Sequence, residues 1–94
     1  MEISYDEAKH QRNLAQRGLG FDRVYELDFA TAIFTIDNRK DYGEVRWRGL
    51  ASLANRIHAF VFVETVHGIR IISFRKANIK EVKHYEEENA KRGI

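Results

Sequence analysis

The stretch Ile57–Ala77, IHAFVFVETVHGIRIISFRKA, decides the fold. Residues 59–63 form an apolar run of β-branched and aromatic side chains, which is typical of a buried strand. Residues 69–74 form a second run of the same kind. Gly68 stands between the two runs, where a hairpin turn often needs a positive φ angle. The stretch therefore predicts a β-hairpin, and its second strand ends in two basic side chains.

Two further strands are expected before this hairpin. Residues 30–36 are rich in β-branched side chains, which favour extended structure. In residues 43–50 apolar and charged side chains alternate, so Trp47 would face one side of a sheet, and Arg46 and Arg48 the other. Together with the hairpin, these segments predict four consecutive antiparallel strands.

Helical spacing and capping signals predict helices at residues 6–17 and 79–89. The last one is preceded by Asn78 and Glu81, which are spaced for a capping box. Residues 21–29 have a helical spacing that favours a short second helix, but residues 24–29 suit an extended strand as well. Residues 1–5 can form a small edge strand, which the fold assignment leaves out. We therefore expect one α+β domain over residues 1–94, with two N-terminal helices, a four-stranded antiparallel meander sheet and a C-terminal helix.

Composition limits the function classes. The 94 residues contain no cysteine and no apolar run near the ~20 residues of a membrane span, so we expect a cytoplasmic protein without disulfides. Residues 1–38 carry a net charge of −3 and residues 39–94 a net charge of +5. The basic second half suits a polyanionic partner, although a solvated surface of mixed charge gives the same pattern. The four histidines lack metal-ligand spacing, so no metal or cofactor is expected.

The basic residues of the second half suggest chemistry on RNA. RNA can be cut when its own 2′-OH attacks the adjacent phosphorus, with a base, an acid and cations that stabilise the phosphorane. Arg46 and Arg75 could brace the phosphate. The candidate bases are Glu44 and His67, and the candidate acids or positioning groups are Tyr85, His84 and Lys83. Three of these residues have simpler explanations: Glu44 and Arg46 as a surface ion pair, and Tyr85 as a core aromatic.

Several motifs resemble the BrnT family of bacterial type II toxins. They are YDEAK at residues 5–9, DYGEVR at residues 41–46, and RIISFRKA at residues 70–77, followed by Glu81 and Tyr85. The sequence departs from the family pattern at Gln16-Arg17, just before the glycine that follows the first helix, and at Val82-Lys83 in the last helix. The resemblance covers nearly the whole chain and implies a fold like that of the RelE ribonucleases.

The resemblance also implies a function, namely a metal-independent endoribonuclease (an mRNA interferase) that inhibits translation. It implies a BrnA-like antitoxin, a ribbon-helix-helix DNA-binding protein that alone contacts operator DNA. Combined with the charge pattern, it gives two predicted sets of residues. The catalytic set is Glu44, Arg46, Arg75, Lys83 and Tyr85. The RNA-binding set is Arg48, Arg70, Lys76 and Lys80. The alternatives are a non-catalytic RNA- or protein-binding module on the same fold and a structural partner of a DNA-binding protein.

Overall fold

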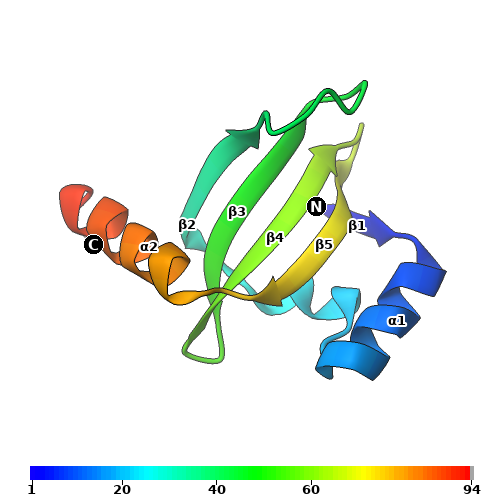
Figure 1. Cartoon of the computed structure of the whole chain (residues 1–94), viewed down its shortest axis with the longest axis horizontal. Coiled ribbons are helices and arrows are strands. Elements are labelled where there is room, and N and C mark those ends of the chain that lie inside the picture. The colour runs from blue at the N-terminus through cyan, green and yellow to red at the C-terminus, as the bar shows by residue number, and fades with distance from the viewer. Residues whose placement is uncertain (94) are drawn as a thin grey trace.

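The computed structural model describes residues 1–93, and within them five strands form a single mixed sheet in the order β1-β5-β4-β3-β2 (Figure 1). The strands are β1 (Glu2–Tyr5), β2 (Asp28–Asp37), β3 (Arg46–Leu53), β4 (Arg56–Glu64) and β5 (Gly68–Lys76). The helices are α1 (Glu7–Arg17), the 3₁₀-helix η1 (Phe21–Glu26) and α2 (Ile79–Lys91). From β2 to β5 each strand pairs antiparallel with the next, and β1 pairs parallel with β5.

The expected fold class is therefore wrong in two respects. The sheet has a fifth strand, β1, and this strand makes the sheet mixed rather than antiparallel. The predicted second helix is only the 3₁₀-helix η1, because the chain is already extended at Leu27 and enters β2 at Asp28. A short strand at residues 1–5 could be suggested from the sequence, but its parallel partner lies more than sixty residues away and leaves no local signal that would place it in the sheet.

Gly68 has a different role from the one expected. Within residues 1–93 the glycines with positive φ are Gly18, Gly43 and Gly93, so Gly68 is not a left-handed turn residue. It pairs with Glu2 of β1, and a Cβ atom at this position would collide with the Glu2 backbone. The glycine is needed because β1 lies against it, so it marks the contact with the fifth strand, which the expected fold class left out.

One face of the sheet is closed by the hydrophobic core. The side chains of Phe60, Phe74 and Ile71 are almost fully buried there. Four apolar residues from the segment between α1 and β2 join this core: Leu19, Phe21, Val24 and Leu27. Phe60 also fills the space beside Gly49, where any Cβ would meet its ring. The core face is therefore specified by aromatic packing over the centre of the sheet.

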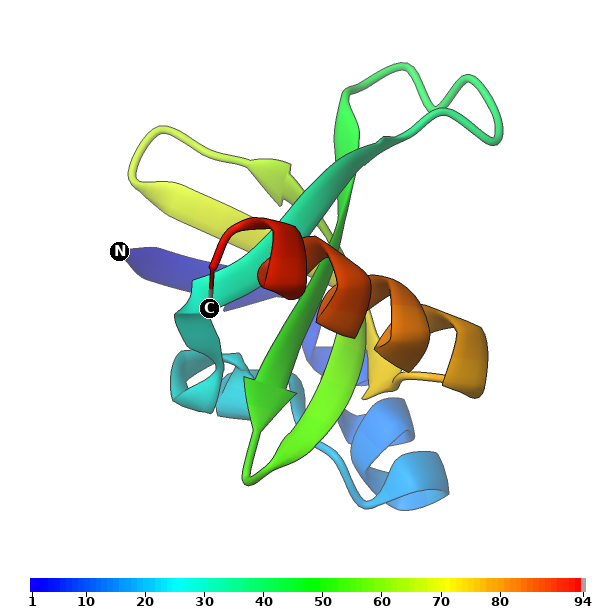
Figure 2. The same ribbon diagram turned by 90° about the vertical axis from the view of Figure 1, so that its left-hand side faces the viewer.

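The other face of the sheet remains partly open, and α2 crosses its margin (Figure 2). Polar contacts hold α2 against β2. The Tyr85 hydroxyl donates to Thr31 Oγ1 at 2.7 Å, Asn89 Nδ2 donates to the Thr31 carbonyl at 3.0 Å, and Arg92 Nη1 donates to the Ala32 carbonyl at 3.0 Å. The predicted Asn78–Glu81 capping box is confirmed at the start of α2. These contacts place the first two turns of α2 beside the open face. No helix within residues 1–93 is long and apolar enough to cross a membrane.

Candidate functional site

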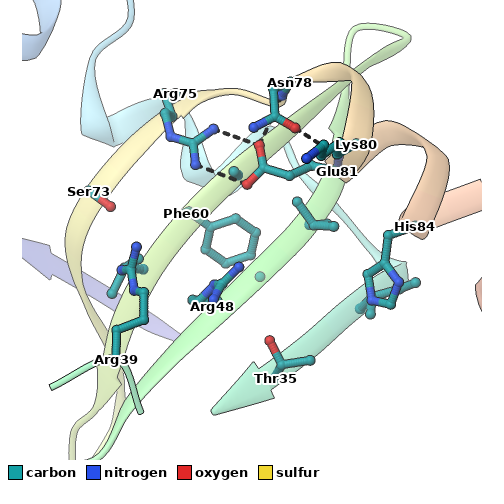
Figure 3. Close-up of a pocket in the computed structure, with 15 residues that line it drawn as sticks. Thr35, Arg39, Arg48, Phe60, Ser73, Arg75, Asn78, Lys80, Glu81 and His84 are labelled. Atoms are coloured by element: carbon teal, nitrogen blue, oxygen red, sulfur yellow. Dashed lines mark hydrogen bonds and ion pairs between the residues drawn. The ribbon is translucent and has the colours of Figure 1, made fainter. Parts of the chain in front are cut away.

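A hollow of about 530 Å³ lies on the open face, between the sheet and the first two turns of α2 (Figure 3). Its floor comes from β2, β3, β4 and β5, and its side wall comes from α2 and the residue before it. Basic side chains of several elements line it: Arg39, Arg48, Arg75, Lys80 and His84. Glu81 is the acidic residue among the lining residues that the structure describes. Basic side chains therefore outnumber acidic ones around the hollow, which suits it to an anion.

The strand register builds the floor of the hollow as two rows across the sheet. One row runs Thr35, Arg48, Val61 and Ser73, and the other runs Ile33, Leu50, Ala59 and Arg75. Paired residues project from the same face, and alternate residues of a strand share that face, so both rows look into the hollow. The register thus separates the two arginines by the apolar side chains of β4.

Arg75 is held at the edge of the hollow by Glu81. Its Nη1 and Nη2 atoms donate to the two carboxylate oxygens at 2.7 Å and 2.9 Å, and Glu81 Oε1 also accepts from the Asn78 backbone N–H at 2.9 Å. The Arg75 side chain is still 39% exposed, whereas that of Glu81 is 17% exposed. The hydrogen bonds from Arg75 lower the pKa of Glu81 and raise the pKa of Arg75. Glu81 thus stays a charged anchor that fixes the guanidinium in place.

Arg39 reaches the hollow from the segment between β2 and β3. Its Nε and Nη2 atoms donate to the two carboxylate oxygens of Asp37 at 2.8 Å and 2.7 Å. The Asp37 side chain is only 1% exposed, and these hydrogen bonds hold the pKa of Asp37 well below its usual range. The same contacts raise the pKa of Arg39. A buried carboxylate at the end of β2 therefore orients Arg39 while most of its side chain stays accessible.

Arg48 is the cation at the centre of the floor. It lies on β3 between Thr35 and Val61 in the cross-strand row. None of the ion pairs within residues 1–93 involves Arg48. Arg48 can therefore offer its guanidinium to a ligand without first giving up a carboxylate partner.

The structure divides the residues of the two predicted sets. It brings Arg75, Arg48 and Lys80 together at the hollow. It does not place the others among the lining residues: Glu44, Arg46, Lys83, Tyr85, Arg70 and Lys76. The hydroxyl of Tyr85 is hydrogen-bonded to Thr31, so it helps to hold α2 in place. The catalytic roles of these residues stay predictions.

Glu44 and Arg46 belong to a network beside the hollow. Arg46 Nε donates to Glu44 at 3.1 Å, and its guanidinium lies 4.1 Å from the centre of the Tyr42 ring. The Tyr42 hydroxyl in turn donates to Asp37 at 3.4 Å. The network therefore links Arg46 to the carboxylate that orients Arg39.

Two of the basic residues that line the hollow, Arg39 and His84, were missing from the two predicted sets, although His84 was among the candidate acids. His84 follows Lys80 by four residues and Glu81 by three, so helical spacing alone would have placed all three on one side of α2. Arg39 gave no such signal, because it lies in a polar segment whose path depends on the buried Asp37. Within residues 1–93, no three histidine, cysteine, aspartate or glutamate side chains gather as a metal site.

Fold and site together define the class of this protein: a small mixed-sheet domain with a hollow that is rimmed by cations and suited to an anionic ligand. Within that class, the chain belongs to the BrnT family. A family model described as the ribonuclease toxin, BrnT, of type II toxin-antitoxin systems matches residues 5–81. The resemblance noted in the sequence is thereby confirmed, and membership implies a protein antitoxin as partner. A search of curated proteins finds no match to the chain. The matched span ends at Glu81, so His84 lies beyond it.

Proposed function

We propose that the chain is a metal-independent endoribonuclease that binds RNA phosphates in the hollow and inhibits translation by cutting RNA. The observation that carries this proposal is the convergence of Arg39, Arg48, Arg75, Lys80 and His84 on one hollow. These side chains come from β3, β5, α2 and the segment after β2, so several elements of the fold contribute to the same cationic site. Cations so arranged can stabilise the extra negative charge of a pentavalent phosphorane.

The proposed reaction uses the 2′-OH of the RNA itself. A base removes the proton of this hydroxyl, the O2′–P bond forms, and the P–O5′ bond breaks as the leaving oxygen is protonated. The products are a 2′,3′-cyclic phosphate and a 5′-hydroxyl end. We assign the protonation of the leaving O5′ to His84, because an imidazolium can donate a proton and this side chain lines the hollow. Water or hydroxide from the solvent accepts the proton of the 2′-OH.

The three arginines have different freedom to bind phosphate. Arg48 has its whole guanidinium available, whereas Arg75 and Arg39 each direct two nitrogen atoms at a carboxylate. A guanidinium has five N–H donors, so each of these two keeps donors for a phosphate oxygen. We therefore place the scissile phosphate at Arg48 and the neighbouring phosphates at Arg75, Arg39 and Lys80.

The experiment is cleavage of a 5′-labelled, unstructured RNA by the purified protein in EDTA. We expect products ending in a 2′,3′-cyclic phosphate, and no cleavage when the 2′-hydroxyls are methylated. His84→Ala should lower the rate at least about a hundredfold. Lys83→Ala is the matched neighbour on α2, and a larger loss there would instead support the predicted catalytic set, which contains Lys83. Salt-dependent RNA binding without any cleavage would favour a non-catalytic RNA-binding module.

For the antitoxin, we propose a BrnA-like ribbon-helix-helix protein that covers the toxin and alone contacts operator DNA. Family membership supports the antitoxin, and its DNA-binding fold is the finer part of this proposal. Expression of the toxin alone in the cytoplasm should arrest cell growth. Co-expression of the protein from the neighbouring small open reading frame should relieve this arrest. If a neighbouring protein without a ribbon-helix-helix sequence relieves the growth arrest, the antitoxin is not of the proposed fold.

A further inference from the structure

The hollow combines two kinds of surface, and its cations explain only one of them. Its floor contains the apolar side chains of Ile33, Leu50, Ala59 and Val61. All except Ala59 are only half-buried, so apolar surface faces the hollow. A site that bound phosphate alone would gain nothing from this surface, because apolar side chains offer a phosphate no hydrogen bonds. The floor therefore suits a second, less polar part of the ligand.

The strand register alternates charge and apolar surface across the floor. Arg48 on β3 pairs with Val61 on β4, and Ala59 on β4 pairs with Arg75 on β5. Val61 and Ala59 therefore lie between the two arginines. A nucleic acid strand offers a comparable pattern, because each sugar between two phosphates carries a flat base that projects from the backbone. Two cations flanking an apolar surface thus match two phosphates flanking one nucleobase.

Neutral polar groups complete this surface. Thr35 and Ser73 stand at the two ends of the row that contains Arg48 and Val61, and both line the hollow (Figure 3). Hydroxyl groups donate and accept hydrogen bonds, so they can contact the edge of a base in either sense. Ser73 lies on the strand next to Val61, so it can contact the edge of a base lying on Val61, whereas Thr35 lies beyond Arg48 at the far margin of the floor.

We propose that the floor around Val61 and Ala59 is a nucleobase subsite that makes the protein select unpaired RNA. This inference rests on the proposed function and deepens it. A base inside a duplex is stacked and paired, so it cannot lie flat on the sheet. The strand must therefore be single at the bound nucleotide, and the identity of that base contributes to the choice of cleavage site.

The first experiment measures binding of a fully 2′-O-methylated RNA heptamer, which the proposed chemistry cannot cut. A series of heptamers carries one abasic position each, with every phosphate retained. We expect one position at which loss of the base weakens binding about tenfold, since burial of one base face is worth that much. Equal binding of every abasic heptamer and the intact one would overturn the subsite. If unmodified RNA is still cut in that case, the proposed function stands without it.

A pair of variants ties the effect to the floor. Val61→Thr keeps the volume of the side chain but replaces a methyl group with a hydroxyl group at the subsite, and we expect the abasic penalty to fall to about threefold. Val63→Thr makes the same change two residues along β4, where Val63 is half-buried but does not line the hollow. It should keep the full penalty. An equal reduction in both variants would overturn the placement on Val61.

The second experiment compares cleavage of one sequence in a loop and in a stem of the same RNA hairpin. We expect cleavage only in the loop. Equal cutting in the stem would overturn the inference while leaving the ribonuclease activity established. Absence of both cutting and salt-dependent binding would remove the proposed function and the subsite together.

Discussion

The two faces of the sheet are built from the same strands but in opposite ways. On the core face, Phe60, Phe74 and Ile71 are buried almost completely, and aromatic rings fill the space between strands. On the open face, Arg48, Val61 and Arg75 occupy the intervening positions and remain partly accessible. Because successive residues of a strand alternate between faces, one strand can specify the fold on one side and carry the site on the other. Substitutions on the two faces should therefore have different consequences.

The largest expected effect is on the core face. Phe60→Ala removes a ring that is 1% exposed and contacts Phe29, Phe34 and Phe62, and it should lower the free energy of unfolding by about 3–5 kcal/mol. Urea denaturation followed by circular dichroism measures this loss. Val63→Ala on the other face of β4 is the control, with an expected loss of about 1 kcal/mol. Similar losses in both variants would show that the two faces share the stabilisation equally.

The next effect is on activity, and it belongs to the open face. Arg48→Ala should lower kcat/KM for RNA cleavage by about a hundredfold, because one preorganised donor to the phosphorane is lost. The free energy of unfolding should change by less than about 0.5 kcal/mol, since Arg48 is exposed. Arg17→Ala, in the last turn of α1, removes the same charge away from the hollow and serves as the control. Equal losses of kcat/KM in the two variants would show that Arg48 contributes only through the net charge of the protein.

The contrast between the faces also explains what could be predicted from the sequence. The hairpin of β4 and β5 could be predicted from the sequence, because apolar runs of β-branched and aromatic residues are typical of buried strands. β1 was not assigned to the sheet, because its pairing with β5 depends on residues more than sixty positions away. The second helix was overestimated, because the spacing of Phe21 and Val24 suits a 3₁₀-turn as well as an α-helix.

Prediction of the site was limited in a similar way. Arg75, Arg48 and Lys80 could be proposed from strand alternation and from the capping signal at Asn78. Their convergence could not, because it depends on how α2 is anchored to β2 through Thr31. Residues recognised from a motif alone need not share one surface, as the separation of Tyr85 from the hollow illustrates.

A third prediction concerns the ion pair at the edge of the hollow. Glu81→Gln keeps a side chain that can complete the capping box but removes the charge that Arg75 binds. At pH 7 it should lower the free energy of unfolding by about 1 kcal/mol, a modest value because Arg75 is partly exposed and screened by solvent. Urea denaturation of both proteins measures the difference.

The difference should depend on pH in a defined direction. Arg75 lowers the pKa of Glu81 in the folded protein below its ordinary value of 4.5. The stabilisation is therefore complete above pH 4.5 and is lost as the pH falls through the lower pKa of the folded state. Asp37 and Glu26 also have lowered pKa values, but they are common to both proteins and cancel in the comparison. A difference that grows on acidification would contradict the ion pair as its source.

The smallest expected effect decides how far the open face extends. Arg46 was predicted to be catalytic, yet it lies beside the hollow, paired with Glu44 and stacked on Tyr42. If Arg46 acts only through Tyr42 and Asp37 on the orientation of Arg39, Arg46→Ala should raise KM about threefold and leave kcat unchanged, because phosphate binding weakens while the reacting groups stay in place. Arg46→Lys should not restore the wild-type KM, since an ammonium group cannot stack on the ring as a guanidinium does. A fall in kcat of about a hundredfold would instead place Arg46 at the reacting phosphate, and the active surface would then continue from the hollow along β3 to the start of that strand.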